Sequence, residues 1–265
     1  MPTSLSIVLP AYNEERRIGP ALDELFAYLC GLEPGTLPES VRVLVVDDGS
    51  TDGTVGVVRA RPEFRSEGGH VASGCELRLL SVAHGGKGSA VRAGVLASDA
   101  DVVVFADADM ATPPNQLPRL VSALATADVA LGSRIQPDGS DMRASQPRFR
   151  RWIGRIFRFA AQLWVTGTVR DTQCGFKGFR GPVGHDLFSL LKVTSIVFDV
   201  DLIYLARRRG YRIAIVPVVW ADRRGSRMHA RPKLAARVAW DLVRIRFIHH
   251  GVSRHAATAP SPEVS

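Results

Sequence analysis

The chain has 265 residues, of which 46% are hydrophobic, and it carries a formal net charge of +8 at pH 7. This length suits one globular domain with a sizeable core, and no apolar run approaches the roughly 20 residues of a membrane-spanning helix. The three cysteines lie far apart without metal-ligand spacing, which argues against a disulfide framework and a cysteine-bound metal. We therefore expect a protein of the cytosol or of a membrane surface, without a secretory signal.

The first half of the chain alternates short apolar runs with turn signals and helical segments. Strands are predicted at residues 5–9, 41–46, 77–82, 101–106 and 129–131. Helices are predicted near residues 15–30, after Ser50-Thr51-Asp52, from the Gly85–Gly88 turn to about 97, and near 114–125. This βαβα order predicts an α/β fold with a doubly wound, mostly parallel sheet and helices on both faces.

Two acidic clusters follow two of these strands. Asp47 and Asp48 come directly after one apolar run, and Asp107-Ala108-Asp109 follow another. In open α/β sheets, ligands bind beyond the carboxyl ends of the strands, and side chains two residues apart share a side of an extended segment. Asp107 and Asp109 can therefore converge on one ion. Helix capping and turn formation are the alternative, but two clusters together favour a site for a nucleotide and a divalent metal.

The Gly85-Gly86-Lys87-Gly88 turn is a candidate phosphate cradle, because glycine lets backbone N–H groups approach an anion at a helix start. It lacks the spacing of a Walker A loop. Taken alone it is weak evidence, and it gains weight only beside the two acidic clusters.

The charge is divided unevenly along the chain. Residues 1–133 contain 10 basic and 17 acidic side chains, whereas residues 134–265 contain 24 basic and 9 acidic ones. The basic half indicates an anionic partner. Nucleic acid, anionic lipid and a phosphorylated substrate are all compatible with charge alone.

Two segments of the basic half have helical apolar stripes flanked by arginines, at residues 148–164 and 232–249. Each is either an ordinary core-facing helix with a solvated basic face or an interfacial helix on an anionic membrane. The stripes are Trp152, Ile156, Phe159 and Leu163 in the first, and Leu234, Val238, Leu242, Ile245 and Ile248 in the second. Residues 255–265 are rich in Ala, Pro and Ser, and we expect them to be disordered.

Seven motifs in one order resemble the family 2 glycosyltransferases of the GT-A fold that make polyprenyl-phosphate sugars. The resemblance covers about residues 5–230, and its Asp171–Lys177 segment is similar to the dolichyl-phosphate glucosyltransferase branch. The motifs are Pro10-Ala11-Tyr12-Asn13-Glu14, Val46–Asp52, Gly86-Lys87-Gly88, Asp107-Ala108-Asp109, Gly132-Ser133-Arg134, Asp171–Lys177 and Phe198-Asp199-Val200.

The resemblance implies a Rossmann-like GT-A domain over residues 1–228. Its nucleotide-sugar and metal half would be 1–133, and its acceptor half 134–228. A basic amphipathic helix at the membrane surface would follow at 229–254, ahead of the tail at 255–265.

The resemblance also implies roles for individual residues. Asp107 and Asp109 match the DXD motif that places Mg²⁺ or Mn²⁺ on the donor diphosphate, and Ala111 stands where mannosyl synthases have a metal-binding glutamine. The nucleotide-sugar set is Pro10, Ala11, Tyr12, Glu14, Asp47, Asp48, Lys87, Asp107, Ala108 and Asp109. The acceptor-phosphate set is Arg134, Arg150, Ser226 and Arg227, and the catalytic set is Asp109, Arg134 and Arg150. Gln173, Lys177 and Asp199 are expected near the sugar or acceptor, although helix capping explains Asp199 equally well.

The expected reaction is inverting transfer of a sugar from a UDP-sugar to polyprenyl monophosphate, giving a β-linked lipid phosphosugar. UDP-glucose is the first choice of donor and UDP-N-acetylhexosamine the second. A family 2 enzyme acting on a saccharide hydroxyl and a GDP-mannose-dependent enzyme are the alternatives. A nucleic-acid-binding module would leave Asp107 and Asp109 unexplained, so no nucleic-acid partner is expected. We expect a peripheral protein on an anionic membrane at its cytoplasmic face, and homo-oligomerisation is left open.

Overall fold

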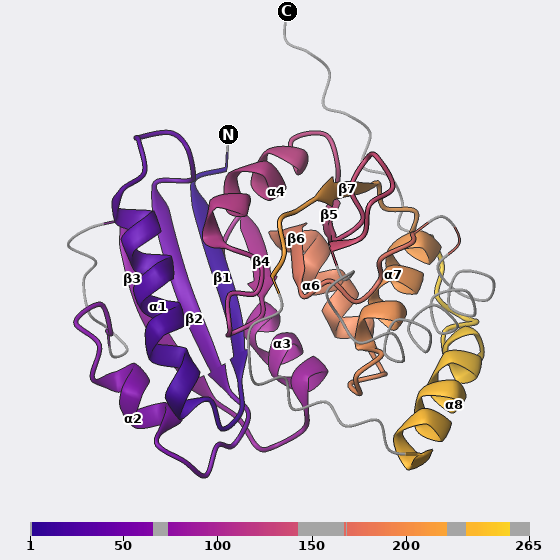
Figure 1. The fold of residues 1–265 in the computed structure, drawn as a ribbon. Helices are drawn as coiled ribbons and strands as arrows, with labels where there is room; N and C mark the ends of the chain where they lie inside the picture. Colours follow the sequence, from indigo (N-terminus) through magenta and orange to yellow (C-terminus); the bar gives the residue numbers. More distant parts are fainter. Residues whose placement is uncertain (1, 66–73, 143–166, 168, 222–231, 255–265) are drawn as a thin grey trace, which may run out of the picture.

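The computed structural model describes residues 2–65, 74–142, 167, 169–221 and 232–254. These residues form one sheet of seven strands in the order β3-β2-β1-β4-β6-β5-β7 (Figure 1). The strands are β1 (Ser4–Ala11), β2 (Ser40–Asp47), β3 (Cys75–Ser81), β4 (Val102–Ala106), β5 (Val129–Ser133), β6 (Phe176–Arg180) and β7 (Ile213–Pro217). The predicted α/β fold with a mostly parallel sheet is confirmed.

One strand runs against the others. β6 pairs antiparallel with both β4 and β5, while the remaining pairs are parallel. The sequence did not predict β6, because Phe-Lys-Gly-Phe-Arg combines two charges with a glycine and lacks an apolar run. β6 lies between two predicted strands and brings the Asp171–Lys177 segment beside the end of β4.

Helices cover both faces of the sheet. The helices are α1 (Glu15–Cys30), α2 (Thr54–Arg59), α3 (Lys87–Leu96), α4 (Leu117–Ala123), α6 (Gly181–Leu190), α7 (Phe198–Arg209) and α8 (Pro232–Ile248), with a 3₁₀ turn at Pro114–Gln116. One core layer joins the sheet to α1, α2 and α4, and the other joins it to α3, α6 and α7. Burying the strands on both faces explains why they are nearly continuous apolar runs in the sequence.

Helix α8 packs outside these layers, along α7 and the segment that precedes it. Leu242 and Ile245 are buried against Val193, Val197 and Val200 in a small third core. At least these two members of the predicted apolar stripe therefore face the protein. The other predicted amphipathic segment, residues 148–164, lies outside the described residues. Among the residues that are described, no helix combines the length and apolar character needed to cross a membrane.

Candidate active site

The acidic clusters meet at one edge of the sheet. β1 pairs with β2 on one side and with β4 on the other, in parallel in both cases. The carboxyl ends of these three central strands therefore point to the same edge, as expected for a ligand site in an open α/β sheet. Pro10 and Ala11 end β1 at this edge, next to Asp47 at the end of β2.

Asp47 and Asp48 hold the loops that surround this edge. The two carboxylate oxygens of Asp48 accept hydrogen bonds from the backbone N–H groups of Gly85 and Gly86, at 2.8 and 2.9 Å. Gly86 has φ of +89°, a conformation that favours glycine. Asp47 accepts a hydrogen bond from the N–H of Ser50 at 3.1 Å. These are turn-forming contacts, so a direct contact of either carboxylate with a nucleotide stays a prediction.

An aromatic pair stands beside this loop. The rings of Tyr12 and His84 stack with centroids 4.2 Å apart and an angle of 24° between their planes. Nδ1 of His84 lies 2.8 Å from Oδ2 of Asp48, and Tyr12 is 40% exposed. The pair offers a flat apolar surface with a polar rim, which suits a nucleobase. His84 was missed in the sequence, where its position directly before Gly85-Gly86 was the available signal.

Glu14, also assigned to the nucleotide by resemblance, uses its carboxylate within the protein. It forms an ion pair with Arg17 one turn further along α1. The backbone N–H of Glu14 donates to Thr54 Oγ1 at 2.8 Å, which ties the start of α1 to α2.

The Asp107-Ala108-Asp109 turn follows β4. The N–H of Met110 donates to the carbonyl of Asp107 at 3.0 Å, and Asp109 Oδ1 accepts from the N–H of Ala111 at 3.1 Å. Burial, reinforced by the like charge of Asp107, raises the pKa of Asp109 above its ordinary value. Two carboxylates in this state are stabilised by any cation placed between them.

Gly175 makes room for Asp107. A Cβ atom on Gly175 would lie 2.2 Å from Oδ2 of Asp107, and the carbonyl of Gly175 accepts the N–H of Asp107 at 3.0 Å. A side chain at this position would force the Asp107 carboxylate to move. The Asp171–Lys177 segment therefore lines one side of the acidic site.

Lys87 reaches the acidic pair from the first turn of α3. Its ammonium donates to Oδ1 of Asp107, and the two side chains are 40% and 34% exposed. Desolvation opposes the charged ammonium, but the carboxylates of Asp107, Asp199 and Asp109 outweigh it and raise the pKa of Lys87. The structure thus brings Lys87, Asp107 and Asp109 together, as the resemblance implied.

Lys177 and Asp199 form a buried ion pair behind this site. Nζ of Lys177 donates to Oδ1 of Asp199 at 2.6 Å and to the carbonyl of Cys174 at 2.5 Å, and Lys177 is fully buried. The same ammonium lies 5.2 Å from the ring centre of Phe105. Burial raises the pKa of the neighbouring Cys174 thiol to about 11, so this cysteine stays protonated at neutral pH. Gln173, in the same segment, is half-buried.

Arg134 is held by Asp171. Its backbone N–H, Nε and Nη2 donate to the Asp171 carboxylate at 2.8, 2.9 and 2.6 Å, and the guanidinium lies 5.6 Å from the ring centre of Trp220. The sequence did not predict this pairing. A role of Arg134 toward an acceptor phosphate stays a prediction, and the other three expected phosphate ligands, Arg150, Ser226 and Arg227, lie outside the described residues.

The described residues offer two carboxylates to a divalent cation. They contain no group of three or more His, Cys, Asp or Glu side chains placed around one ion. Asp107 and Asp109 nevertheless fit such an ion, because burial and the like charge of Asp107 raise the pKa of Asp109, and a cation between the two carboxylates would offset this repulsion. The remaining ligands would be diphosphate oxygens and water, in keeping with the preference of Mg²⁺ for wet, oxygen-rich coordination.

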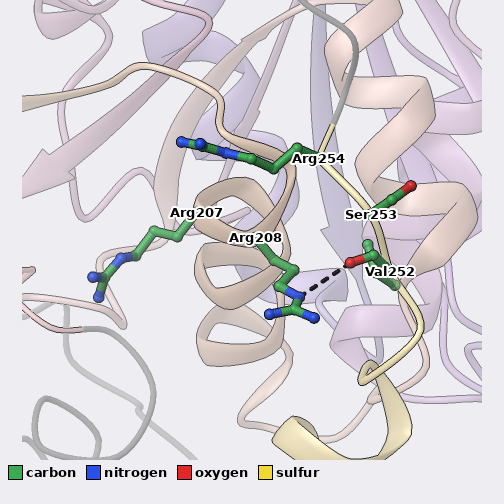
Figure 2. Close-up of a pocket in the computed structure, with 5 residues that line it drawn as sticks. All are labelled: Arg207, Arg208, Val252, Ser253 and Arg254. Atoms are coloured by element: carbon green, nitrogen blue, oxygen red, sulfur yellow. Dashed lines mark hydrogen bonds between the residues drawn. The ribbon is translucent and has the colours of Figure 1, made fainter.

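A separate basic recess lies at the other end of α7. It has a volume of about 410 Å³ and is lined by Arg207, Arg208, Val252, Ser253 and Arg254 (Figure 2). Nε of Arg208 donates to the carbonyl of Val252 at 3.0 Å, which ties the segment after α8 to α7. Asp199 lies in the first turn of α7, beside the acidic site, and the helix is 12 residues or about 18 Å long. The recess is therefore not part of the candidate site.

Similarity to known proteins agrees with this geometry. A dolichyl-phosphate β-glucosyltransferase from Drosophila melanogaster is 36% identical over 231 residues, covering 84% of this chain and 69% of the relative. Glucosyl-3-phosphoglycerate synthase from Mycobacterium tuberculosis, solved with UDP, has a TM-score of 0.63 at 23% identity, covering 93% of this chain and 80% of the other. A second structure of that synthase, with Mn²⁺, UDP and glucosyl-3-phosphoglycerate, has a TM-score of 0.59 at 23% identity, covering 94% and 81%.

The model of glycosyl transferase family 2 matches residues 6–188, which span the strands from β1 to β6 and the whole acidic edge. The dolichyl-phosphate β-glucosyltransferases of mouse and human are 33% and 32% identical to the chain, each over 84% of its length. The chain therefore belongs to glycosyl transferase family 2 and is a glycosyltransferase of the GT-A fold.

Proposed function

We propose that the protein transfers glucose from UDP-glucose to a polyprenyl monophosphate, with inversion, to give a β-linked polyprenyl-phosphate glucose. The observation that carries the proposal is the similarity to dolichyl-phosphate β-glucosyltransferases over 84% of the chain. The Mycobacterium tuberculosis synthase, which shares the fold, was crystallised with UDP and Mn²⁺, which supports a UDP-sugar and a divalent cation here as well.

The donor would lie along the acidic edge. The stacked rings of Tyr12 and His84 would receive the base, and the Gly85-Gly86 turn would place the start of α3 near the diphosphate. Asp107 and Asp109 would hold Mg²⁺ or Mn²⁺. This ion would supply charge compensation for the leaving diphosphate.

A phosphate acceptor would remove the need for a general base. A lipid monophosphate has a second pKa of about 6 and is largely a dianion at neutral pH. It is already a nucleophile, so the protein must orient it rather than deprotonate it. A saccharide hydroxyl would need a general base instead. Lys87 and Lys177 are both engaged in ion pairs next to the site, which suits charge positioning more than proton removal.

Arginines of the basic half would hold this acceptor. Arg134 is oriented by Asp171, which keeps its planar guanidinium in a fixed position beside Trp220. Arginine suits a phosphate because it donates parallel hydrogen bonds and keeps its charge. Arg150, Ser226 and Arg227 complete the set that we propose.

The acceptor lipid places the protein at a membrane, and α8 has a second apolar stripe that suits this location. Trp240, Val243 and Phe247 are 65%, 47% and 65% exposed, at the i, i+3, i+7 spacing of one helix face. They lie on a different face from the buried Leu242 and Ile245. We propose that this exposed stripe enters an anionic bilayer at the cytoplasmic face, with Arg244 and Arg246 near the headgroups.

A donor screen tests the proposed function. Purified protein is incubated with polyprenyl phosphate and with labelled UDP-glucose, UDP-N-acetylglucosamine, UDP-N-acetylgalactosamine or GDP-mannose. UDP-glucose should give the fastest lipid labelling, and titration calorimetry with Mn²⁺ should show UDP binding about tenfold tighter than GDP, a difference of about 1.4 kcal/mol. Preferred use of GDP-mannose, or equal affinities for UDP and GDP, would overturn the donor assignment.

A further inference from the structure

We propose that Lys87 is a positioning residue that links metal binding to donor binding: its ammonium neutralises Asp107 when no divalent cation is bound, and moves to the donor diphosphate when the cation arrives. The inference rests on the proposed use of a nucleoside diphosphate donor and a divalent cation. It assigns a specific task to one side chain of that site and predicts how two ligands affect each other.

The backbone of Lys87 is fixed while its side chain can move. The two residues before it donate their N–H groups to the buried Asp48 carboxylate at 2.8 and 2.9 Å, and Lys87 itself begins the ten-residue helix α3. Its side chain is 40% exposed and has four rotatable bonds, so its ammonium can change partner without disturbing the helix.

The charges around Lys87 favour such a change. Asp107, Asp109 and Asp199 all act on its ammonium, and the buried Lys177 is bound to Asp199 at 2.6 Å. These three carboxylates outnumber the two ammonium groups by one. Lys87 is bound to Asp107 and Lys177 to Asp199, so the remaining negative charge belongs to Asp109. Arg17 also acts on Asp109, but it is paired with Glu14. Among the described residues, Lys87 is therefore the partly exposed cation that contacts the Asp107–Asp109 pair directly.

A divalent cation and the Lys87 ammonium compete for Asp107. The ammonium donates to Oδ1 of Asp107, so an ion held by Asp107 and Asp109 would meet a positive charge at its own ligand. Repulsion between the ammonium and a cation bound to the same carboxylate is strong where water is partly excluded. The cation alone should therefore bind weakly. A diphosphate gives the ammonium a new partner, because lysine binds phosphate as a point charge.

Reciprocal coupling follows. A diphosphate that draws Lys87 away from Asp107 should strengthen metal binding, and by linkage the metal should strengthen diphosphate binding by the same factor. The buried Lys177 cannot act in this way, because it is fully enclosed and bound to Asp199 and to the carbonyl of Cys174.

The test measures Mn²⁺ affinity from the electron paramagnetic resonance signal of free Mn²⁺, with and without UDP, in the full-length protein. Lys87→Met should bind Mn²⁺ alone about fivefold more tightly than the wild type and should bind UDP alone more weakly. The factor by which UDP strengthens Mn²⁺ binding should fall by about tenfold. Lys87→Gln should change the Mn²⁺ affinity, the UDP affinity and the coupling factor in the same directions. Lys87→Arg, which keeps the charge, should retain most of the coupling.

The control variant is Lys192→Met, whose ammonium donates to the carbonyl of Ile248 at the end of α8 and should leave Mn²⁺ and UDP affinities unchanged. Folding of each variant is checked by circular dichroism and by its melting temperature.

Unchanged or weaker binding of Mn²⁺ alone by folded Lys87→Met and Lys87→Gln would overturn the proposal, as would an unchanged coupling factor. If the wild type binds neither UDP nor Mn²⁺, the proposed donor site fails together with this inference. Wild-type binding of both ligands with coupling independent of Lys87 overturns only the role of Lys87.

Discussion

The acidic first half and the basic second half of the chain use their charged side chains differently. At the acidic edge, Asp107 and Asp109 remain partly open, and the partly exposed Lys87 donates to Asp107. In the basic half, several cations are held by carboxylates of the protein itself: Arg134 by Asp171, Lys177 by Asp199, Arg209 by Asp186 and Arg212 by Asp128. The net charge of a region therefore overstates what it offers to a partner until its internal ion pairs have been subtracted.

The largest expected effect is on stability, where the buried Arg134–Asp171 ion pair is compared with the exposed Arg212–Asp128 pair. Arg134→Ala removes the guanidinium from a carboxylate whose side chain is 1% exposed, so the free energy of unfolding should fall by about 3–5 kcal/mol. Arg212→Ala is the matched control: Arg212 is 63% exposed, so its loss should change the free energy of unfolding far less. Urea unfolding measures both.

The same variant sharpens the acceptor assignment. If Arg134 also binds the acceptor, folded Arg134→Ala should show a raised KM for polyprenyl phosphate while its affinity for UDP stays nearly unchanged. Loss of UDP binding by folded Arg134→Ala would place Arg134 in the donor site and contradict its assignment to the acceptor phosphate.

The acidic edge is tested by Asp109→Asn. This change removes one charge from the pair and nearly preserves its shape, so kcat should fall at least about 100-fold, or roughly 2.7 kcal/mol. Asp138→Asn, in an exposed turn, should leave kcat within about twofold. Near-normal turnover of Asp109→Asn in the presence of EDTA would contradict the metal role.

The smallest effect distinguishes the two apolar faces of α8. Trp240→Ser and Phe247→Ser alter exposed side chains, so each should change stability by about 0.5 kcal/mol or less but weaken sedimentation with anionic vesicles. Leu242→Ala, on the buried face, should instead lower the free energy of unfolding by about 2 kcal/mol and leave vesicle binding of the folded protein intact. Undiminished vesicle binding by both serine variants would exclude the exposed stripe as the membrane contact.

Much of the acidic half of the chain could be predicted from the sequence. The strands before Asp47 and Asp107 are apolar runs closed by turns, and parallel pairing then brings their ends to one edge. The resemblance implied that Lys87 lies near this edge, and the Gly85-Gly86 turn at a helix start supported it only beside the two acidic clusters. Local pattern and tertiary structure agree here, which is why these strands could be predicted.

The remaining features depend on contacts distant in sequence. β6 has no apolar run, and it is stabilised by pairing on both sides and by the buried Lys177–Asp199 ion pair. The Arg134–Asp171 pair joins residues 37 positions apart, which no local spacing indicates. On α8, the sequence showed one apolar stripe but could not tell whether this stripe faces the protein or a membrane. The third core, which contains Val193 and Val197, decides this.

The most direct test of the account compares two acceptors that differ only in the phosphate. Purified protein is incubated with labelled UDP-glucose, Mn²⁺ and either polyprenyl phosphate or the corresponding polyprenol, and the labelled lipid is analysed for linkage and anomeric form. The account predicts a β-linked phosphodiester product with polyprenyl phosphate and no transfer to polyprenol. Glucosylation of polyprenol, or transfer to a saccharide hydroxyl that needs no lipid phosphate, would contradict it.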